Sequence, residues 1–428
     1  MTESDVHRSI RGRLGGLGLP LVVTAVAFAL GYLSKLPCHL AGWPEPRTVP
    51  LAQYCYSDIP ELFQTRALYA GVFPFSPENP QPLEYPVLTG IVMYLTARIE
   101  MIVYRGVEIV PAAQTYFHIN VVLLLLVAMV TVAATWALLR RNGGRPSDAL
   151  LVAASPSLIF AGTINWDLLV VALAGLALLA WAHDRPVLAG ALIGLGTATK
   201  LYPLFILGPL LVLCARQGRM PAFWRATAAA VAAWLAANVP VAIAYPDGWL
   251  EFFRFNTDRP ADFGAIWYAF ELVGYPVPGL NVIAPLSFLL LCAGIGALAW
   301  YAPRPPTIEQ LAFLVVTAFL VTNKVYSPQY VLWMLPLAVL ARGSVPFPRV
   351  LRDFALWQAA ELLYWATVWG YLEDRLYYSY ALSIVLRLAV TVWFAGQVVH
   401  EIRSARAEPA SDGDAEVAER PTALTVQP

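Results

Sequence analysis

The sequence predicts an all-α integral membrane protein, a polytopic bundle of about 12 transmembrane helices with a long first external loop. Of its 428 residues, 59% are hydrophobic and 13% are charged, whereas charged residues make up about 25% of an ordinary soluble chain. The mean hydropathy is +0.61. Apolar runs recur along most of the chain, and basic turns alternate with mixed-charge turns between them. We therefore expect the chain to cross the membrane repeatedly.

Charge and cysteine usage exclude some classes of partner. Lys plus Arg and Asp plus Glu both number 28, so no basic surface for nucleic acid is indicated. The four Cys and five His show no spacing typical of a zinc site. We predict no nucleic-acid partner.

The first span is predicted at residues 14–33, about the length needed to cross a bilayer. Four basic or titratable residues precede it, namely His7, Arg8, Arg11 and Arg13. A basic flank favours the cytoplasmic side. The residues that follow offer no small-residue cleavage site, so we expect a retained helix rather than a signal peptide.

The first external loop, residues 37–86, carries the carboxylates Asp58, Glu61 and Glu84 just outside the membrane. A charged side chain costs little in water and much in hydrocarbon, so these residues could serve as reagents without destabilising a span. The alternative is structural, because Ser57 or Asp58 followed by Glu61 resembles a helix capping box.

Two of the four cysteines, Cys38 and Cys55, fall in this loop, whereas Cys214 and Cys292 lie inside apolar runs. Disulfides form and persist in the oxidising compartment outside the membrane. We predict a disulfide between Cys38 and Cys55.

An odd number of crossings must separate this loop from the arginine cluster at residues 140–145, because clustered arginines favour the cytoplasm. Two apolar segments lie between them, 86–103 and 116–139. We favour one full crossing at 116–139, and we expect 86–103 to lie along the interface or to be re-entrant.

The remaining spans continue the alternation of charge. They are predicted at 149–164, 168–182, 187–199, 204–215, 226–244, 280–301, 308–322, 329–341, 353–370 and 378–399. Both termini are then cytoplasmic. Residues 1–400 form the predicted membrane domain, and residues 401–428 are too poor in apolar side chains to fold, so we expect a disordered cytoplasmic tail.

Several of these runs, notably 187–199 and 329–341, are shorter than the roughly 20 residues that a span needs. Their polar ends are expected to dip toward bilayer depth or into a cavity. Charge at that depth is tolerated only where it lines water or protein. We therefore expect Lys200 and the pair Asn323-Lys324 to face one shared crevice.

The predicted topology gathers many polar side chains at the external membrane face. They are Asp58, Glu61, Glu84, Asn165, Asp167, Lys200, Asp258, Arg259, Lys324, Tyr326 and Gln329. Each has a structural explanation when taken alone, since cations can snorkel to headgroups and an aspartate can cap a helix. Their joint presence on one face favours a functional crevice.

A crevice with a carboxylate, several cations and aromatic rings suits transfer of a sugar from a lipid phosphate. Glycoside hydrolysis needs an acid to protonate a poor leaving group. A phosphate leaves without that help, so one base can take the acceptor proton while Lys or Arg holds the departing charge.

Five motifs occur in order along the chain: Tyr56-Ser57-Asp58, Glu84-Tyr85-Pro86, Asn165-Trp166-Asp167, ATKLYP at 198–203 and NKVYSPQY at 323–330. Together they resemble the motifs of the family 87 mannosyltransferases, integral membrane enzymes of the GT-C class that are found in actinobacteria and use polyprenyl-phosphate-mannose. The resemblance extends from about Leu14 to about His400.

This resemblance implies a GT-C-like fold and an inverting, α-1,2-mannosyltransferase-like transfer to a cell-envelope glycolipid or lipoglycan. The partners would be a polyprenyl-phosphate sugar donor, that acceptor and membrane lipids. The reaction would use neither a metal nor another cofactor, and the external loops contain no Asp-x-Asp of the metal-dependent branch. The enzyme would lie in the plasma membrane with its active site outside.

Roles for single residues also follow from the resemblance. Asp58 matches the family's loop aspartate and would be the general base, with Glu61 as the second candidate. Lys200, and less directly Arg259 and Lys324, match basic positions suited to the donor phosphate. The further substrate-binding candidates are Glu61, Glu84, Tyr85, Asn165, Asp167, Asp258, Asn323, Tyr326 and Gln329.

Three alternative hypotheses stay open. The first is a transferase of arabinofuranose or another sugar from a polyprenyl phosphate. The second is a lipid or sugar transporter, although no motif is duplicated between the two halves of the chain, as it is in many transporters. The third is a non-enzymatic scaffold, against which the presence of both Asp58 and Lys200 argues.

Overall fold

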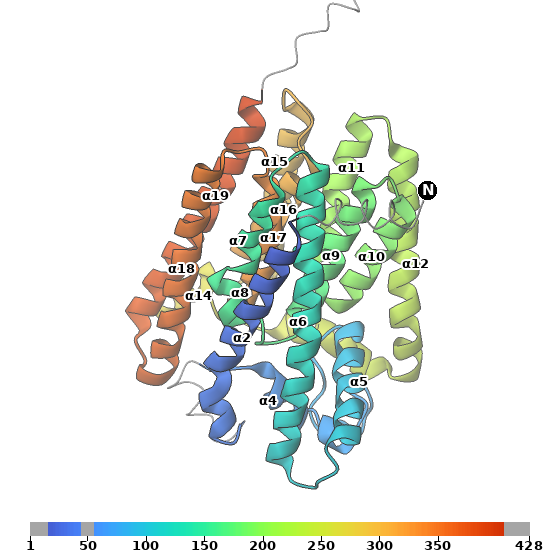
Figure 1. The fold of residues 1–428 in the computed structure, drawn as a ribbon, viewed down its shortest axis with the longest axis vertical. Coiled ribbons are helices and arrows are strands. Elements are labelled where there is room, and N and C mark those ends of the chain that lie inside the picture. The colour runs from blue at the N-terminus through green and yellow to red at the C-terminus, as the bar shows by residue number, and fades with distance from the viewer. Residues whose placement is uncertain (1–15, 44–54, 406–428) are drawn as a thin grey trace, which may run out of the picture.

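The computed structural model describes residues 16–43 and 55–405, and within these ranges every regular element is a helix. Figure 1 shows the longest helices running side by side along one axis. The predicted all-α class is confirmed. The long helices are α2 (Gly18–Leu40), α6 (Ile109–Arg141), α12 (Met220–Ala244), α15 (Leu280–Tyr301), α18 (Phe347–Asp374) and α19 (Tyr377–Ser404).

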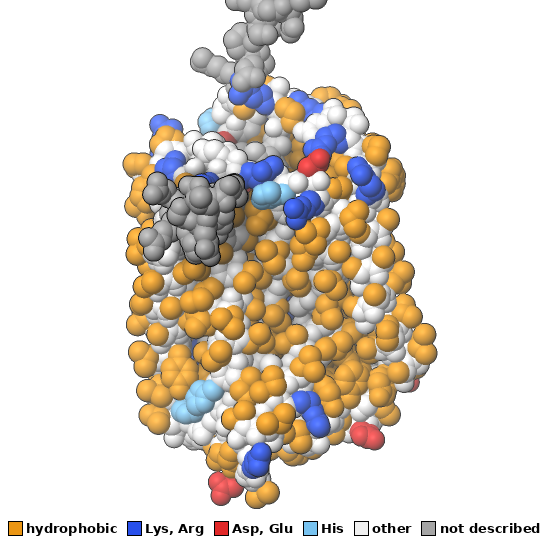
Figure 2. All heavy atoms as spheres, turned by 45° about the vertical axis from the view of Figure 1, so that its right-hand side comes forward, with side chains coloured by type: hydrophobic (Ala, Val, Ile, Leu, Met, Phe, Trp, Pro, Cys, Tyr) orange, Lys and Arg blue, Asp and Glu red, His pale blue; other side chains and the backbone are white. Residues whose placement is uncertain are grey.

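The outer surface is that of a multi-pass membrane protein. By length and composition, α2, α6, α12, α15 and α19 could each cross a membrane. On α15 the large apolar residues Leu286, Leu289 and Leu290 are 59%, 60% and 74% exposed, as expected for a face that contacts lipid. Figure 2 shows hydrophobic side chains over the middle of the visible face, with most Lys and Arg toward its upper end.

Shorter apolar helices complete the bundle: α9 (Asp167–Ala182), α10 (Pro186–Thr199), α11 (Leu207–Arg216), α16 (Ile308–Thr322) and α17 (Val331–Ala341). Every residue of α17 is buried. Helix α10 packs so closely on α12 that a Cβ added at Gly190 or Gly194 would lie 1.9 or 2.1 Å from a backbone oxygen of α12. Small residues permit this approach between membrane helices. The short helices α9, α16 and α17 are mostly buried inside the bundle, whereas α11 is buried along one side only.

Each expected span coincides with at least one helix, although the number of crossings stays a prediction. The run 149–164 is broken, with η2 (Pro146–Asp148) and α7 (Ala149–Ala153) followed by α8 (Pro156–Ala161). Pro156 has no N–H to continue a helix. The Ser155 hydroxyl restarts it by accepting a hydrogen bond from the Leu158 N–H at 3.1 Å.

Helix α5 (Val87–Val103) stays at one end of the bundle, beside the lower part of α6 and close to α4 (Figure 1). The Tyr116 hydroxyl on α6 donates to the Met93 carbonyl at 3.1 Å. The Thr89 hydroxyl donates to the Thr199 carbonyl, at the end of α10, at 2.7 Å. Of the two alternatives for 86–103, this arrangement fits the re-entrant one better.

A disulfide joins Cys38, near the end of α2, to Cys55, with 5.9 Å between the Cα atoms. In the entropic model, closing a loop of this length contributes about 3 kcal/mol. Helix α19 continues to Ser404, past the expected boundary at residue 400. The predicted basic N-terminal flank and the tail from residue 406 onward lie outside the described residues.

Candidate active site

One face of α4 (Asp58–Thr65) forms a wall of a cavity of about 510 Å³. The residues that this segment contributes are Asp58, Glu61, Leu62, Thr65 and Arg66. Their spacing of three and four is that of one helix face. Ile59 and Phe63 on the other face are fully buried. The amphipathic pattern of α4 therefore points its polar side chains into the cavity.

Ser57 caps α4, so the Asp58 carboxylate is not used as the helix cap. The Ser57 hydroxyl accepts from the Ile59 N–H at 3.3 Å and donates to the Thr163 carbonyl at 2.8 Å. The Asp58 N–H donates to the Ile164 carbonyl at 2.7 Å. These bonds fix the start of α4 against the segment between α8 and α9. Of the two capping candidates, Ser57 is the cap.

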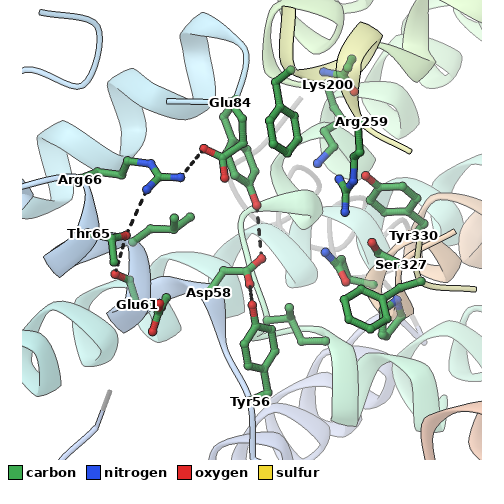
Figure 3. Close-up of a pocket in the computed structure, with 18 of the residues that line it drawn as sticks. Tyr56, Asp58, Glu61, Thr65, Arg66, Glu84, Lys200, Arg259, Ser327 and Tyr330 are labelled. Carbon is green, nitrogen blue, oxygen red and sulfur yellow. Dashed lines mark hydrogen bonds and ion pairs between the residues drawn. The ribbon is translucent and has the colours of Figure 1, made fainter. Parts of the chain in front are cut away.

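Two tyrosines hold the Asp58 carboxylate (Figure 3). The Tyr56 hydroxyl donates to Oδ1, and the Tyr85 hydroxyl donates to Oδ2 at 3.3 Å. Asn165 Nδ2 donates in turn to the Tyr85 oxygen at 3.3 Å. Burial, reinforced by the charge of Asp58, raises the pKa of both phenols well above 10, so both remain protonated donors.

Burial also raises the pKa of Asp58 to about 6, and nearby Glu84 adds to the effect. The hydrogen bonds from Tyr56 and Tyr85 and the charge of Lys200 oppose it. A pKa near the working pH suits a general base, because the group is largely ionised and still binds a proton well.

Lys200 follows the end of α10, and its Nζ lies 3.1 Å from Asp167 Oδ1. It also lies 4.8 Å from the ring centre of Tyr85 and 5.2 Å from that of Tyr330. Its side chain is only 15% exposed. The ammonium therefore faces the cavity and does not extend to the outer surface. Asp167 also accepts from Trp333 Nε1 at 2.9 Å.

Two arginines, Arg66 and Arg259, line the cavity in addition to Lys200. Arg259, after α13 (Pro246–Asp258), has its Nη2 2.6 Å from Asp262. Arg66 has its Nη2 2.6 Å from Glu84. Figure 3 shows Lys200 and Arg259 on one side of Asp58 and Arg66 on the other. The carboxylate thus lies between two separate cationic groups.

A buried ion pair between Arg387 and Glu361 lies behind the part of the cavity wall that carries Arg259. Arg387 Nε donates to Glu361 at 2.8 Å, and its Nη1 donates to the Tyr326 carbonyl at 2.7 Å. Its guanidinium lies 3.5 and 4.0 Å from the ring centres of Tyr326 and Tyr364. Gly264, with φ +72°, is required here, because a Cβ would meet the Tyr326 carbonyl oxygen at 2.2 Å.

Beside this pair, backbone hydrogen bonds join two loops. The Asp262 N–H donates to the Lys324 carbonyl at 2.9 Å, and the Tyr326 N–H donates to the Phe263 carbonyl at 2.8 Å. One loop carries Arg259 and the other leads into η4 (Pro328–Tyr330). Arg387 donates to the Tyr326 carbonyl at the point where these two loops meet.

The predicted site residues fall into three groups. Those that line the cavity are Asp58, Glu61, Glu84, Tyr85, Lys200, Arg259 and Gln329. Those buried behind it are Asn165, Asp167 and Tyr326. Those elsewhere are Asp258, Asn323 and Lys324: Asn323 Nδ2 donates to the Val325 carbonyl at 2.9 Å, and the other two line a more open cavity of about 290 Å³ beyond Arg259.

The structure contradicts the expectation of one crevice shared by Lys200 and Lys324. Lys324 Nζ donates to the Asn256 carbonyl at 2.9 Å, the Thr257 carbonyl at 3.1 Å and Asn281 Oδ1 at 2.6 Å. These bonds turn the ammonium away from Asp58 toward the end of α13 and the start of α15. Lys324 is a structural residue of that corner.

Several side chains at or behind the cavity were not predicted from the sequence, although a signal existed for some of them. Arg66 continues the α4 face that begins at Asp58. Glu361 and Arg387 are charged residues inside apolar spans, where such residues are rare and tend to be functional. Tyr330, which lines the cavity, is the last residue of the NKVYSPQY motif but was not predicted as a site residue, and no sequence pattern indicated Trp369.

An apolar groove of about 370 Å³ adjoins the cavity at Tyr85, Pro86 and Phe252. Its other walls come mainly from the C-terminal half of α12, from α13 and from the segment after Lys200. Leu204 and Leu235 in these walls are 42% and 43% exposed, so the groove opens onto the side of the bundle. Among the described residues, no cluster of three His, Cys, Asp or Glu could hold a metal ion.

The model of glycosyltransferase family 87 matches residues 83–322, more than half of the chain. The chain belongs to glycosyltransferase family 87. It is therefore a glycosyltransferase. The matched range includes Glu84, Lys200 and Arg259, whereas Asp58 precedes it and joins the site through its contact with Tyr85.

One solved structure similar to this family 87 glycosyltransferase is the crystal structure of ArnT from Cupriavidus metallidurans bound to undecaprenyl phosphate. The similarity has a TM-score of 0.49 and 14% sequence identity, and it covers 94% of this chain and 80% of that chain. No curated protein matches the sequence.

Proposed function

We propose that this glycosyltransferase transfers mannose from polyprenyl-phosphate-mannose to a glycolipid or lipoglycan of the cell envelope, at the external face of the plasma membrane. The observation that carries the proposal is the junction of the charged cavity with the apolar groove at Tyr85, Pro86 and Phe252. A polyprenyl phosphate sugar has a charged head on an apolar chain. The junction would accept both parts of such a donor at once.

The charges suit the donor head. Lys200 and Arg259 line the cavity near the groove, so the phosphate would bind beside them while the chain lies along the groove wall at Leu201 and Leu204. Cations held by protein partners need little rearrangement when negative charge builds on the leaving phosphate.

The proposed reaction is a direct displacement. Asp58 takes the proton of an acceptor hydroxyl, and the acceptor oxygen forms a bond to the anomeric carbon. The bond from that carbon to the phosphate oxygen breaks at the same time, and its electron pair leaves with the polyprenyl phosphate. One displacement inverts the configuration at the anomeric carbon, as the family resemblance implies.

The test uses purified protein in lipid nanodiscs with radiolabelled polyprenyl-phosphate-mannose and a membrane glycolipid extract as acceptor. Transfer of label to glycolipid would support the proposal. Transfer from polyprenyl-phosphate-arabinofuranose alone would replace mannose by that sugar. Movement of intact donor across the bilayer without any new glycoside would instead indicate a transporter.

A deletion strain gives an independent test. Loss of this enzyme should shorten a mannose-containing glycolipid or lipoglycan, which mass spectrometry of extracted lipids would detect. A shortened arabinan with normal mannolipids would contradict the proposed sugar.

A further inference from the structure

The buried face of α2 carries a lysine. Lys35 follows Gly31 by four residues and precedes Cys38 by three, so the three lie on one face of the helix, and all three are buried. Lys35 is 0% exposed. A charged side chain inside an apolar helix is costly, and such residues tend to be functional. The reaction proposed above gives this lysine no role.

Close packing of α2 against α8 brings the Lys35 ammonium to two backbone carbonyls. A Cβ at Gly31 would lie 2.5 Å from the Ile159 carbonyl oxygen, so glycine is required for this approach. One turn further along α2, Lys35 Nζ donates to the Phe160 carbonyl at 3.4 Å and to the Tyr56 carbonyl at 2.9 Å. Figure 1 shows α2 passing beside α8.

The Tyr56 carbonyl belongs to the residue whose hydroxyl donates to Asp58 Oδ1. Lys35 therefore fixes the backbone end of Tyr56. Its Nζ also lies 5.1 Å from the ring centre of Trp365. The Trp365 ring lies 4.9 Å from that of Trp369, which lies 5.8 Å from that of Tyr56. The backbone and the ring of Tyr56 thus both lead back to Lys35.

The charge of Lys35 also acts on Asp58. The two groups interact electrostatically, and such interactions are stronger inside a protein than in water. A nearby cation favours the ionised form of a carboxylate, which is the form that a base needs. The other titratable groups around Asp58 are Tyr56, Tyr85, Glu84 and Lys200, with Glu61 on the next turn of α4.

We propose that Lys35 is a positioning residue for the general base: its ammonium holds the Tyr56 carbonyl, and through Tyr56 it sets the position of the Asp58 carboxylate. This inference rests on the proposed function and adds a residue to its machinery. Lys35 does not line the cavity, so it acts through its neighbours. The disulfide to Cys55 attaches the same segment to α2, so replacing Lys35 should alter the placement of Tyr56 without releasing the segment.

Kinetics of Lys35→Met test the proposal, because this variant keeps an unbranched side chain and removes the ammonium. Its kcat should fall at least tenfold, on the order expected when a reacting group is slightly misplaced. The acidic limb of log kcat/KM should move up by about one pH unit, at the low end of the shifts that nearby charges and hydrogen bonds produce. Affinity for undecaprenyl phosphate should change less than twofold. An unmoved acidic limb would overturn the proposal.

A double-variant cycle shows whether Lys35 acts through Tyr56. In a Tyr56→Phe background the hydroxyl that Lys35 positions is gone, so Lys35→Met should then move the acidic limb by less than half as much. An equal shift in both backgrounds would mean that Lys35 acts by its charge alone, and it would overturn the positioning role.

Two further variants separate this role from a loss of folding. Lys35→Gln replaces Lys35→Met if the latter does not fold, because an amide can still donate to one carbonyl, and it should also move the acidic limb upward. The matched control is Thr24→Val. Thr24 is buried on the same face of α2, and its hydroxyl donates to the Pro20 carbonyl at 2.8 Å. This control should leave the acidic limb in place, and an equal shift there would overturn the proposal.

An infrared titration decides the inference without any donor. Spectra recorded against pH, with those of Asp58→Asn subtracted, follow the protonated Asp58 carboxyl. The midpoint should lie near pH 6 in the wild type, since the pKa of Asp58 is raised to about 6, and higher in Lys35→Met. A raised midpoint in protein that transfers nothing from polyprenyl-phosphate-mannose would support the positioning role and contradict the proposed donor. An unchanged midpoint would overturn the positioning role whatever the turnover.

Discussion

At the scale of single residues, the proposed general base differs from an ordinary surface aspartate in its surroundings. Asp58 lines the cavity and accepts hydrogen bonds from tyrosine side chains at both of its carboxylate oxygens. Asp58→Asn keeps the shape but cannot accept a proton. We expect at least a hundredfold loss of kcat, on the order of magnitude typical for a missing general base, with donor binding retained.

The control for that variant is Glu61→Gln, which removes a second carboxylate of the same cavity. Turnover within tenfold of wild type is expected there. A severe loss in Glu61→Gln together with normal turnover in Asp58→Asn would transfer the role of base to Glu61. Radiolabelled transfer and binding of undecaprenyl phosphate would be measured for both.

The pH profile is a second prediction for this residue. Burial raises the pKa of Asp58 to about 6, and only the ionised carboxylate can take a proton. Activity should therefore be constant above about pH 7 and fall as pH drops through about 6, as expected for a base of this pKa.

Tyr56→Phe supplies the matched variant for the pH profile. The Tyr56 hydrogen bond favours the charged form and lowers the pKa of Asp58, so its loss should move the acidic limb of log kcat/KM to higher pH. An unmoved or lower limb would contradict the assignment of the titration to Asp58.

Lys200 is the proposed anchor of the donor phosphate. Lys200→Gln should weaken donor binding and turnover by roughly 2 to 4 kcal/mol together, since the contact strengthens as charge builds on the leaving group. Isothermal titration with undecaprenyl phosphate and steady-state kinetics would measure the two effects.

Two further variants keep the Lys200 test interpretable. Lys200→Gln with Asp167→Asn avoids leaving a buried carboxylate unpaired, and it should remain as inactive as the single variant. Lys324→Gln removes a lysine that lies outside the cavity, so donor affinity should hardly change. Normal kinetics in both Lys200 variants would leave Arg259 as the phosphate-binding residue.

At the scale of the elements, Glu361 on α18 and Arg387 on α19 form a buried ion pair. It lies where the loop that carries Arg259 meets the loop that leads into η4. Removing one partner of a buried pair typically costs about 3 to 5 kcal/mol. Arg387→Met should therefore lower the thermal stability of the detergent-solubilised protein strongly. The double variant Arg387→Met, Glu361→Met should recover much of that stability, since no charge is left unpaired.

Activity distinguishes positioning from stability in these variants. The double variant still lacks the guanidinium N–H that donates to the Tyr326 carbonyl. Its KM for the polyprenyl-phosphate sugar should therefore stay above that of the wild type. The control is Arg254→Met, because the Arg254–Asp247 pair is exposed and such pairs contribute little. Full activity in the double variant would show that Arg387 has no positioning role.

At the scale of the whole molecule, the cavity and the end of α19 lie at opposite ends of the bundle. Figure 1 shows α4 at the lower end, and α19 ends at the upper end. Helix α6 begins near α4 and ends in Arg140 and Arg141 at the other end, and the disulfide lies at the α4 end. Arginines favour the cytoplasm and disulfides the outside, so both signals predict an external cavity.

Cysteine labelling in whole cells tests this orientation. In a background without Cys214 and Cys292, Glu78→Cys should react with a membrane-impermeant maleimide in intact cells. Ser404→Cys should react only after the cells are opened. The reverse pattern would put the cavity in the cytoplasm and contradict the proposed site of transfer.

The sequence by itself determined the features that depend on local hydrophobicity and local order. Apolar runs predicted where helices form, because each helix bonds its own backbone whatever its neighbours are. The motifs located Asp58 and Lys200. The three- and four-residue spacing of α4 already placed Asp58, Glu61 and Arg66 on one face, although Arg66 was not predicted as a site residue.

The tertiary structure alone decided which distant residues meet. It paired Lys200 with Asp167, turned Lys324 toward Asn281, and brought Arg387 to the carbonyl of Tyr326, 61 residues away in the chain. A charged residue inside an apolar span indicates that it has a partner, but the sequence does not identify that partner. Helix packing determines which residues become partners. Close contacts such as that of Gly190 with α12 fix the rotation of α10 about its own axis, and with it the direction of each of its side chains.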